Sequence, residues 1–407
     1  MNKKIALIGK TLKHSYSKII HNLMADYLYD LVEVAPENLK EFAQNGGYDG
    51  YNVTIPYKKD IMAYLDEIDE FARLIGAVNT VVVDGGKRKG YNTDFRGMTY
   101  ALERAGITVK DKCVLILGSG GTSNTAQAVT KHLGAKKVAV VSRTGECNYE
   151  NCYLLSDTNV IINTTPVGMF PNNYQSVIDL SRFPLLEGVL DAIYNPSLTK
   201  FLYQAKKLGV KYTDGLPMLV AQAKYAMELF LGTSHPDDII EEVLGKIRKQ
   251  VQNIVLIGMP GSGKSTVGER LAQVLGKEFI DTDAKIVQKD GRDIPTIFSE
   301  SGEEYFRSLE KEVLKEVGIL SGKVIATGGG VVKDKENYFA LKQNADIVWI
   351  KRPIEKLSTD GRPLSTDLER VKKLFNERKD SYLEFSDYAV DNDKDIEQVV
   401  KGVMDIL

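Results

Sequence analysis

Short apolar runs alternate with amphipathic stretches along the whole of the 407-residue chain. The apolar runs have the length and composition of buried β-strands. The stretches between them repeat their apolar residues at helical spacing. This alternation predicts an α/β fold, in which parallel sheets are covered by helices.

Three of the apolar runs open larger segments of the chain: KKIALIG at 3–9, KCVLILGSGG at 112–121 and NIVLIGMPGSGKST at 253–266. The second and third run straight into glycine loops and then into helical patterns, which is typical of the first βα unit of a nucleotide-binding domain. Just before the third run, Ser234 is expected to cap a helix with Pro236 in its first turn and basic residues at its end. No flexible linker follows, so we expect a stiff joint near residue 249.

Composition and charge narrow the classes of function. The chain has 43% hydrophobic and 27% charged residues, as expected of two or three globular domains. Its 53 basic and 55 acidic residues lack the positive excess of nucleic-acid binders. The three cysteines and four histidines lack the spacing of a disulfide framework or zinc site. No apolar run approaches the length of a membrane span, and the first run breaks too early for a signal peptide, so we expect a cytosolic protein without a membrane partner.

The third glycine loop satisfies the phosphate-loop pattern GxxxxGK[ST]. Its backbone N–H groups are expected to surround phosphate oxygens, with Lys264 reaching the β- and γ-phosphates and Ser265 binding Mg²⁺. A chance match in a glycine turn is the alternative, but the pattern lies between a strand and a helix, as the motif requires. The predicted ATP contacts are Gly261, Ser262, Gly263, Lys264, Ser265 and Thr266.

Further polar residues follow in the same half. Asp281 and Asp283 are spaced by two, so both face one side if the segment is extended; one could bind the metal and the other accept a proton from a substrate hydroxyl. Solvated turn carboxylates are an equal alternative. Arg307 and Glu310 share a helix face, where a surface ion pair is the simpler explanation. Gly328, Gly329 and Gly330 after a buried strand allow close approach of a ligand.

Taken together, these motifs resemble shikimate kinase over residues 250–407, through GMPGSGKST, DTD, GEEYFR, TGGG, GRPL and RKDSY. The resemblance implies that Asp283 holds the hydroxyl to be phosphorylated and that Asp281 and Ser265 hold the metal. Arg307, oriented by Glu310, and Arg378 would clamp the substrate carboxylate, while Gly329 and Gly330 offer N–H groups. Arg362 would belong to a lid over the ATP phosphates. The family's extra arginine near the adenine, shortly before that lid residue, is not evident here.

In the first half, Gly118, Gly120 and Gly121 follow a strand and open a helix, although Ser123 stands where a dinucleotide fingerprint has its last glycine. A plain glycine turn is the alternative. The next strand ends in Ser142, Arg143 and Thr144, and an arginine there suits the 2′-phosphate of NADP rather than the free ribose of NAD.

The first hundred residues contribute polar groups that could contact a substrate. Ser15 and Ser17 could face one ligand if their segment is extended. Asn52, Thr54 and Lys58 lie in NVTIPYK, where Pro56 is a good helix start. Asn79, Asn92 and Asp94 follow. Each alone is more typical of a turn or a cap.

Their joint order resembles shikimate dehydrogenase over residues 1–248, with INTTPVGM, DAIYNPSLTKFL and DGLPMLVAQA in support. The resemblance implies NADPH-dependent reduction of 3-dehydroshikimate, with Lys58 as acid/base and Asp94 as its partner. Implied substrate contacts are Ser15, Ser17, Asn52, Thr54, Lys58, Asn79, Asp94, Tyr194 and Gln222. Implied NADP contacts are Gly118, Ser119, Gly120, Gly121, Thr122, Ser142, Arg143, Thr144, Thr165 and Gly215. Only GECNYENCYLL follows SRT before the next strand, so one helix of the cofactor domain is expected to be missing.

Three other interpretations stay open. The first half could be a sensing module without turnover, a hypothesis motivated by its short cofactor domain, or a quinate-type dehydrogenase using NAD. The second half could be a nucleotide-monophosphate kinase, although Arg307, Glu310 and the triple glycine favour a carboxylate substrate.

The two resemblances imply successive reactions, because the first half would create the hydroxyl that the second half phosphorylates. We therefore expect a bifunctional enzyme of aromatic amino-acid biosynthesis that uses NADP(H), ATP and Mg²⁺. Its partners would be small molecules, 3-dehydroshikimate and shikimate, and a homo-oligomer is left open. The expected architecture is a substrate domain at 1–100 completed by 217–248, a Rossmann NADP domain at 101–216 and a phosphate-loop kinase domain at 249–407.

Overall fold

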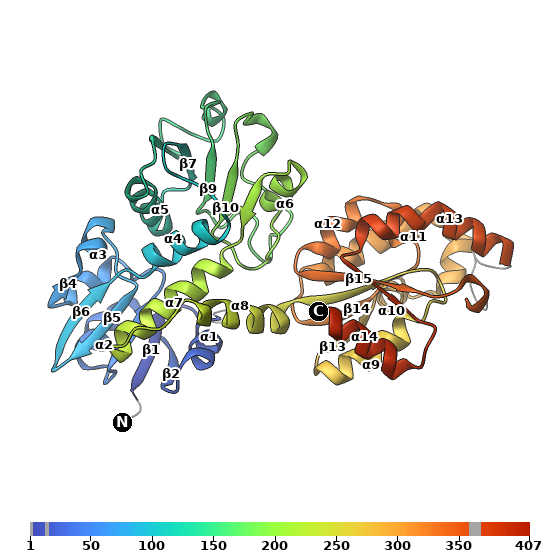
Figure 1. Cartoon of the computed structure of the whole chain (residues 1–407), viewed down its shortest axis with the longest axis horizontal. Coiled ribbons are helices and arrows are strands. Elements are labelled where there is room, and N and C mark those ends of the chain that lie inside the picture. The colour runs from blue at the N-terminus through green and yellow to red at the C-terminus, as the bar shows by residue number, and fades with distance from the viewer. Residues whose placement is uncertain (1–2, 13–15, 358–367) are drawn as a thin grey trace. The chain divides into compact units, whose positions relative to one another are not determined.

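The computed structural model describes residues 3–12, 16–357 and 368–407 (Figure 1). The chain divides into two compact units, Met1–Ile247 and Arg248–Leu407. Both are built from sheets and covering helices, which confirms the predicted α/β fold class. No helix within the described ranges is long and apolar enough to cross a membrane.

The first unit begins with a six-stranded sheet in the order β2-β1-β3-β5-β6-β4. Its strands are β1 (Lys4–Gly9), β2 (Leu28–Glu33), β3 (Gly50–Val53), β4 (Glu67–Ile68), β5 (Thr80–Asp84) and β6 (Lys87–Tyr91). The alternating pattern predicted parallel sheets, but this sheet is mixed, because β5 pairs antiparallel with both β3 and β6. The antiparallel pairing of β5 with β6 has a local cause, because Gly85 and Gly86 both have positive φ and form a two-residue hairpin turn between them.

The second sheet of this unit is wholly parallel, in the order β11-β10-β9-β7-β8. Its strands are β7 (Cys113–Leu117), β8 (Lys137–Val141), β9 (Val160–Asn163), β10 (Gly188–Asp191) and β11 (Lys211–Thr213). Figure 1 shows α5 (Gly121–His132) on one side of this sheet and α6 (Lys200–Lys207) on the other. Between β8 and β9 the described chain forms only a 3-10 helix, η3 (Cys152–Leu154), where the sequence predicted a missing helix.

The first unit contains further helices, the last of which continues into the second unit. They are α1 (Ser17–Met24), α2 (Leu39–Asn45), α3 (Glu70–Ile75), α4 (Asp94–Arg104), α7 (Leu216–Leu231) and α8 (Asp238–Val251), with 3-10 helices η1 (Pro36–Asn38), η2 (Asp60–Tyr64) and η4 (Leu180–Arg182). The helices α4 and α7 pack closely because Gly97 has no side chain: a Cβ there would lie 2.6 Å from the Met218 carbonyl oxygen.

Two predicted helix starts are wrong. The helix α8 begins at Asp238 rather than after Ser234, and the Asp237 carbonyl accepts a hydrogen bond from the Ile240 amide in its first turn. Pro56 starts no α-helix, since turns follow it and lead into the 3-10 helix η2. Both predictions used the proline and capping pattern, which cannot tell a helix start from a turn.

The second unit holds one parallel sheet in the order β13-β14-β12-β15-β16. Its strands are β12 (Asn253–Ile257), β13 (Glu278–Asp281), β14 (Lys323–Ala326), β15 (Ala345–Lys351) and β16 (Tyr388–Asp391). Its helices are α9 (Lys264–Leu275), α10 (Thr282–Asp290), α11 (Ile294–Gly318), α12 (Glu336–Lys342), α13 (Leu368–Phe385) and α14 (Ile396–Ile406), with η5 (Val331–Lys333) and η6 (Ile354–Lys356).

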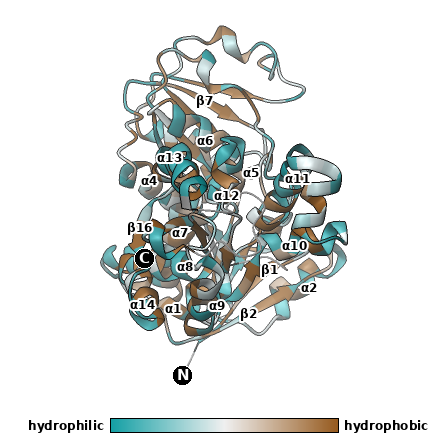
Figure 2. Ribbon diagram, turned by 90° about the vertical axis from the view of Figure 1, so that its right-hand side faces the viewer, coloured by the Kyte–Doolittle hydropathy of each residue, from teal (hydrophilic) through white to brown (hydrophobic). Residues whose placement is uncertain are grey.

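Helices cover both faces of this sheet. One buried cluster joins it to α11, α12 and α13, and another joins it to α9 and α14. Apolar residues concentrate in the strands, as Figure 2 shows for β7 of the first unit, while helices such as α11 carry both apolar and polar residues.

Candidate active sites

The phosphate loop of the second unit connects β12 to α9. At its start Gly258 has a φ of 149°, and a Cβ there would lie 2.5 Å from the Ile350 carbonyl oxygen, so only glycine fits. The Lys264 ammonium donates to the carbonyl oxygens of Gly258 and Met259, each at 3.0 Å. The loop ends where α9 begins at Lys264, so the positive end of this helix faces the loop, as anion binding requires.

The predicted loop residues lie around one pocket, whose volume is about 510 Å³. Gly261, Gly263, Lys264, Ser265 and Thr266 line it. Ser262 is fully buried beside them. Arg362 lies outside the described residues.

The candidate metal ligands lie at the entrance to α9. The Ser265 hydroxyl donates to Asp281 Oδ2 at 2.6 Å, while Asp281 Oδ1 accepts from the amide of Asp283 at 2.9 Å. Asp281 thus caps α10, and Asp283 lies inside that helix. The condition of an extended segment is not met, because the strand ends at Asp281, yet both carboxylates line the pocket.

This donor set fits Mg²⁺, which prefers hard oxygen ligands and takes one or two from the protein when phosphates and water supply the rest. Among the described residues, no group of three or more His, Cys, Asp or Glu side chains is arranged to hold a metal ion.

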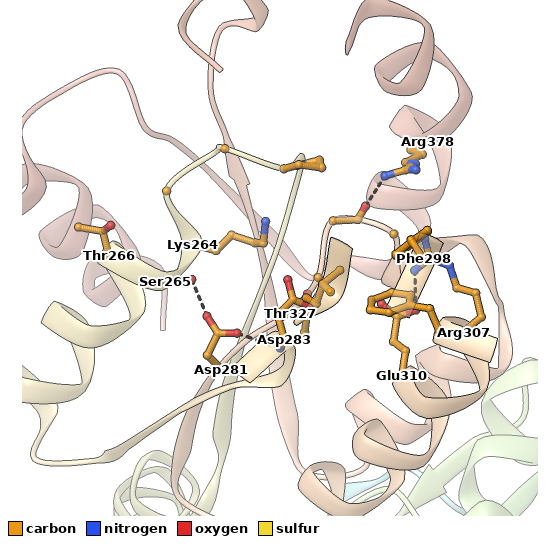
Figure 3. Close-up of a pocket in the computed structure, with 18 of the residues that line it drawn as sticks. Lys264, Ser265, Thr266, Asp281, Asp283, Phe298, Arg307, Glu310, Thr327 and Arg378 are labelled. Atoms are coloured by element: carbon orange, nitrogen blue, oxygen red, sulfur yellow. Dashed lines mark hydrogen bonds and ion pairs between the residues drawn. The ribbon is translucent and has the colours of Figure 1, made fainter. Parts of the chain in front are cut away.

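Figure 3 shows Arg307 and Arg378 across the pocket from Lys264 and Ser265. Arg307 pairs with Glu310 at 2.7 Å and with Glu303 at 3.2 Å. Burial raises the pKa of the Glu310 carboxyl, against the lowering effect of the Arg307 guanidinium. A Cβ on Gly330 would fall 2.3 Å from this guanidinium, so a side chain there would displace Arg307 from its present position.

Arg378 lies on α13 and donates to the Gly329 carbonyl oxygen at 2.9 Å. The Tyr382 hydroxyl donates to the same oxygen at 2.6 Å, and the Tyr382 ring stacks on Trp349 with centroids 5.5 Å apart. Two cationic groups therefore stand at fixed positions beside the triple-glycine segment.

In the first unit, Lys58 and Asp94 form a close ion pair. The Lys58 ammonium lies 2.6 Å from Asp94 Oδ2, and the side chains are 25% and 13% exposed. Lys58 belongs to the turn after β3, and Asp94 is the first residue of α4, where the helix dipole favours a carboxylate. The pair is accessible enough to meet a ligand and buried enough to be held in place.

Buried amides and hydroxyls surround the ends of β3 and β5. Asn79 accepts from the Thr93 amide at 2.7 Å and donates to Gln222 on α7 at 3.3 Å. Asn52 donates to Thr80 at 3.0 Å and accepts from the Tyr29 hydroxyl at 2.8 Å. The sequence analysis missed Tyr29, Thr80 and Thr93.

The other predicted substrate contacts of this site lie outside this network of buried amides. Ser17 is buried and begins helix α1, so the chain is helical from Ser17 onward. Thr54 is half-buried after β3. Asn92 bonds the Ala77 carbonyl and the Phe95 amide, a structural role. Ser15 lies outside the described residues.

The predicted coenzyme residues follow the carboxyl ends of the second sheet. Gly118, Ser119 and Gly120 lead from β7 into α5, where Gly121 and Thr122 are the first residues. Ser142, Arg143 and Thr144 follow β8, and the Ser142 amide donates to the Cys147 carbonyl at 3.1 Å. Thr165 follows β9 and donates to Asn163, which bonds the buried Asp191 at 2.9 Å. Gly215 directly precedes α7.

One aromatic contact joins the two sheets' loops. The rings of Tyr16, directly before α1, and Tyr194, after β10, lie 5.2 Å apart. The dinucleotide-type loops and the Lys58–Asp94 pair thus belong to one compact unit.

Comparisons with known proteins identify both units. Residues 7–81 match the family model of the shikimate dehydrogenase substrate binding domain. The shikimate dehydrogenase (NADP(+)) of Caldicellulosiruptor saccharolyticus is 39% identical over 284 residues, covering 61% of this chain and 100% of that protein. The chain belongs to the shikimate dehydrogenase family. Residues 260–407 match the shikimate kinase family model, so the chain is a fusion of a shikimate dehydrogenase with a shikimate kinase domain.

Solved structures agree for the dehydrogenase unit. A chorismate mutase/shikimate 5-dehydrogenase fusion protein from Clostridium acetobutylicum is 37% identical with a TM-score of 0.58, covering 61% of this chain and 97% of that one. The shikimate 5-dehydrogenase of Thermus thermophilus, solved in complex with NADP(H) and shikimate, is 29% identical with a TM-score of 0.55, covering 60% and 99%. Two enzyme domains are therefore joined in this chain.

Proposed function

We propose that the first unit reduces 3-dehydroshikimate to shikimate with NADPH and that the second phosphorylates shikimate to shikimate 3-phosphate with ATP. The observation that carries the proposal is the 2.6 Å Lys58–Asp94 pair in a chain of this family, joined to a kinase domain that would consume the product. For this function we propose the domain division 1–100 with 217–248, 101–216 and 249–407.

In the reduction, NADPH supplies a hydride to the ketone carbon. Lys58 then gives its proton to the ketone oxygen, and Asp94 holds the ammonium beside that oxygen. The buried amides of Asn52, Asn79 and Gln222 would bind the hydroxyls and orient the ring, because each has donor and acceptor atoms.

The coenzyme contacts support NADP over NAD. Arg143 is exposed after β8, where its guanidinium can pair with a 2′-phosphate. The relatives named NADP(+)-dependent agree with this choice.

In the kinase reaction, ATP and Mg²⁺ supply the phosphoryl group and neutralise its charge. Asp283 accepts the proton of the 3-hydroxyl, while Arg307 and Arg378 hold the substrate carboxylate bidentately. Ser265 and Asp281 would hold the metal. Lys264 would move from its carbonyl partners to the phosphates.

A two-channel assay of the full chain tests both activities. We expect Lys58→Ala to lower NADPH consumption with 3-dehydroshikimate by about 10²- to 10⁴-fold, since it removes the general acid. ADP formation with shikimate should stay at the wild-type level. Asp283→Asn should give the reverse pattern, so each variant's intact activity reports that the chain has folded.

The dehydrogenase proposal fails if the wild-type chain forms no shikimate with either NADPH or NADH. That result would favour the sensing-module interpretation. A preference for NADH with quinate would favour the quinate-type dehydrogenase instead.

A further inference from the structure

Arg352 lies at the edge of the phosphate loop, although no motif in the sequence marks it. It follows β15, which pairs with the phosphate-loop strand β12. The end of β15 touches the loop directly, since the Ile350 carbonyl oxygen is 2.5 Å from the place of a Cβ on Gly258. Arg352 Nη1 is 3.9 Å from the place of a Cβ on Gly263. The side chain therefore lines the same pocket as Gly263, Lys264 and Ser265.

The guanidinium of Arg352 is available for a ligand. Its neighbour Lys351 pairs with Asp391 at 3.1 Å, but Arg352 makes no ion pair or hydrogen bond with any residue that the structure describes. The other two arginines of the pocket are engaged: Arg307 with Glu310, and Arg378 with the Gly329 carbonyl. Arg352 is thus the arginine on the phosphate-loop side of the pocket whose donors are uncommitted in the described chain.

Asn392 holds the loop from the neighbouring strand end. Its amide nitrogen donates to the Lys351 carbonyl at 2.6 Å, and its side-chain Nδ2 donates to the Ser262 carbonyl at 2.7 Å. In a trans peptide the carbonyl and the next N–H point in opposite directions. Fixing the Ser262 carbonyl toward Asn392 therefore turns the Gly263 N–H away from it, where it can serve as a phosphate donor.

We propose that Arg352 binds the phosphate groups of the nucleotide in the kinase site, with Asn392 as a positioning residue for the Gly263 N–H. The proposal rests on the proposed kinase function and adds residues to it. A planar guanidinium fork suits a phosphate, because two parallel N–H donors meet two oxygens.

Calorimetric titration of the full chain with MgADP tests this role without turnover. Arg352→Gln should weaken MgADP binding by about 10- to 100-fold, the usual effect of losing a charged hydrogen-bond donor. Arg352→Lys should recover only part of the affinity, because it restores the charge without the fork. Lys373→Gln, which removes an exposed charge on α13, is the matched control and should bind MgADP as the wild type does.

Affinity of Arg352→Gln within twofold of the wild type would overturn the proposal. An equal loss in Lys373→Gln would also overturn it, since the effect would then be one of overall charge. The NADPH-dependent activity and the melting temperature should be unchanged in both variants. Because MgADP binding needs no shikimate, the test stands even if the chain phosphorylates a different acceptor, so the two proposals can fail separately.

Asn392→Asp tests the positioning role. It keeps the size of the side chain but loses the donor to the Ser262 carbonyl and adds a negative charge, so the KM for ATP should rise severalfold while the KM for shikimate stays constant; Asn392→Leu, which loses the donor without adding a charge, should show the same rise. A purely structural role would move both constants or the melting temperature, and that outcome would contradict the assignment.

Discussion

At the scale of single residues, His21 is the clearest example of a side chain held in one charge state by burial. Its ring is fully buried and stacks on Tyr29 with centroids 4.1 Å apart, and Nδ1 lies 2.5 Å from the Tyr27 hydroxyl. Burial lowers the pKa of His21 to about 3. Tyr29 in turn donates to Asn52, so a neutral histidine stands directly behind one of the amides that we propose to bind the substrate.

This burial predicts a pH dependence of stability. The unfolded chain takes up the His21 proton near pH 6.5, whereas the folded chain does so only near pH 3. Between these values the unfolded state binds one more proton, so the free energy of unfolding rises with pH by about 1.4 kcal/mol per unit and falls on acidification. Above pH 6.5 the contribution is constant.

The measurement is urea denaturation at several pH values from about 4 to 7, compared with His21→Gln. The variant should show a shallower dependence of the unfolding free energy on pH, whatever its absolute stability. His235→Gln serves as the control, because His235 is only partly buried. Parallel curves for the wild type and His21→Gln would show that His21 is protonated in the folded protein.

At the scale of secondary-structure elements, the packing of α4 on α7 brings the dehydrogenase residues together. The helix α4 begins at Asp94, and α7 carries Gln222. Their close approach depends on Gly97, where a Cβ would lie 2.6 Å from the Met218 carbonyl oxygen and 3.1 Å from the Gln222 amide nitrogen. Since both neighbours are backbone atoms, they can yield only if the helices separate.

Gly97→Ala should therefore destabilise the first unit by about 1–3 kcal/mol, as overpacked cores do, and lower the dehydrogenase activity while leaving the kinase activity intact. Gly245→Ala on the exposed side of α8 is the control. A Cβ there meets no atom within 4 Å, so the change should be neutral or stabilise the helix by up to about 1 kcal/mol. Equal effects of the two substitutions in chemical denaturation would contradict the packing argument.

The elements also show how far the sequence alone could lead. The strands before the glycine loops were predictable, because a buried run followed by glycine and a helical pattern has few alternatives. The Gly85–Gly86 hairpin could have been found from VVVDGGKRKGY, where a two-residue glycine turn separates two strands. The position of Asp283 inside a helix could not be predicted from the sequence. It depends on whether the strand ends at Asp281, and that is decided by Asp281 capping α10.

Some site residues could likewise be named from the sequence, and others only from the structure. Lys58 and Asp94 were named from the resemblance, but their 2.6 Å contact depends on how β3 and α4 pack. Arg352 and Tyr29 belong to no local pattern, since they reach the sites only through strand pairing far along the chain. Sequence motifs therefore indicate the chemistry, while neighbours contributed by tertiary packing need the structure.

At the scale of the whole molecule, each of the two units has its own buried core. Four buried hydrophobic clusters lie within 1–247, and two others lie within 248–407. A ligand that binds one folded unit should therefore stabilise that unit alone, by about 2.7 kcal/mol at a hundredfold excess over its Kd.

Scanning calorimetry of the full chain should thus resolve two transitions. We expect NADP to raise the transition of the first unit by roughly 5 °C and MgADP to raise that of the second by a similar amount. Each ligand should leave the other transition in place. A single transition that both ligands shift would show that the two units unfold together.

The stacking of Trp349 on Tyr382 has a practical consequence. Trp349 is the only tryptophan of the chain, and its stacking partner donates to the Gly329 carbonyl beside the kinase pocket. Tryptophan emission of the intact fusion therefore comes from the kinase domain alone. A change in that emission reports on the kinase domain without an added label.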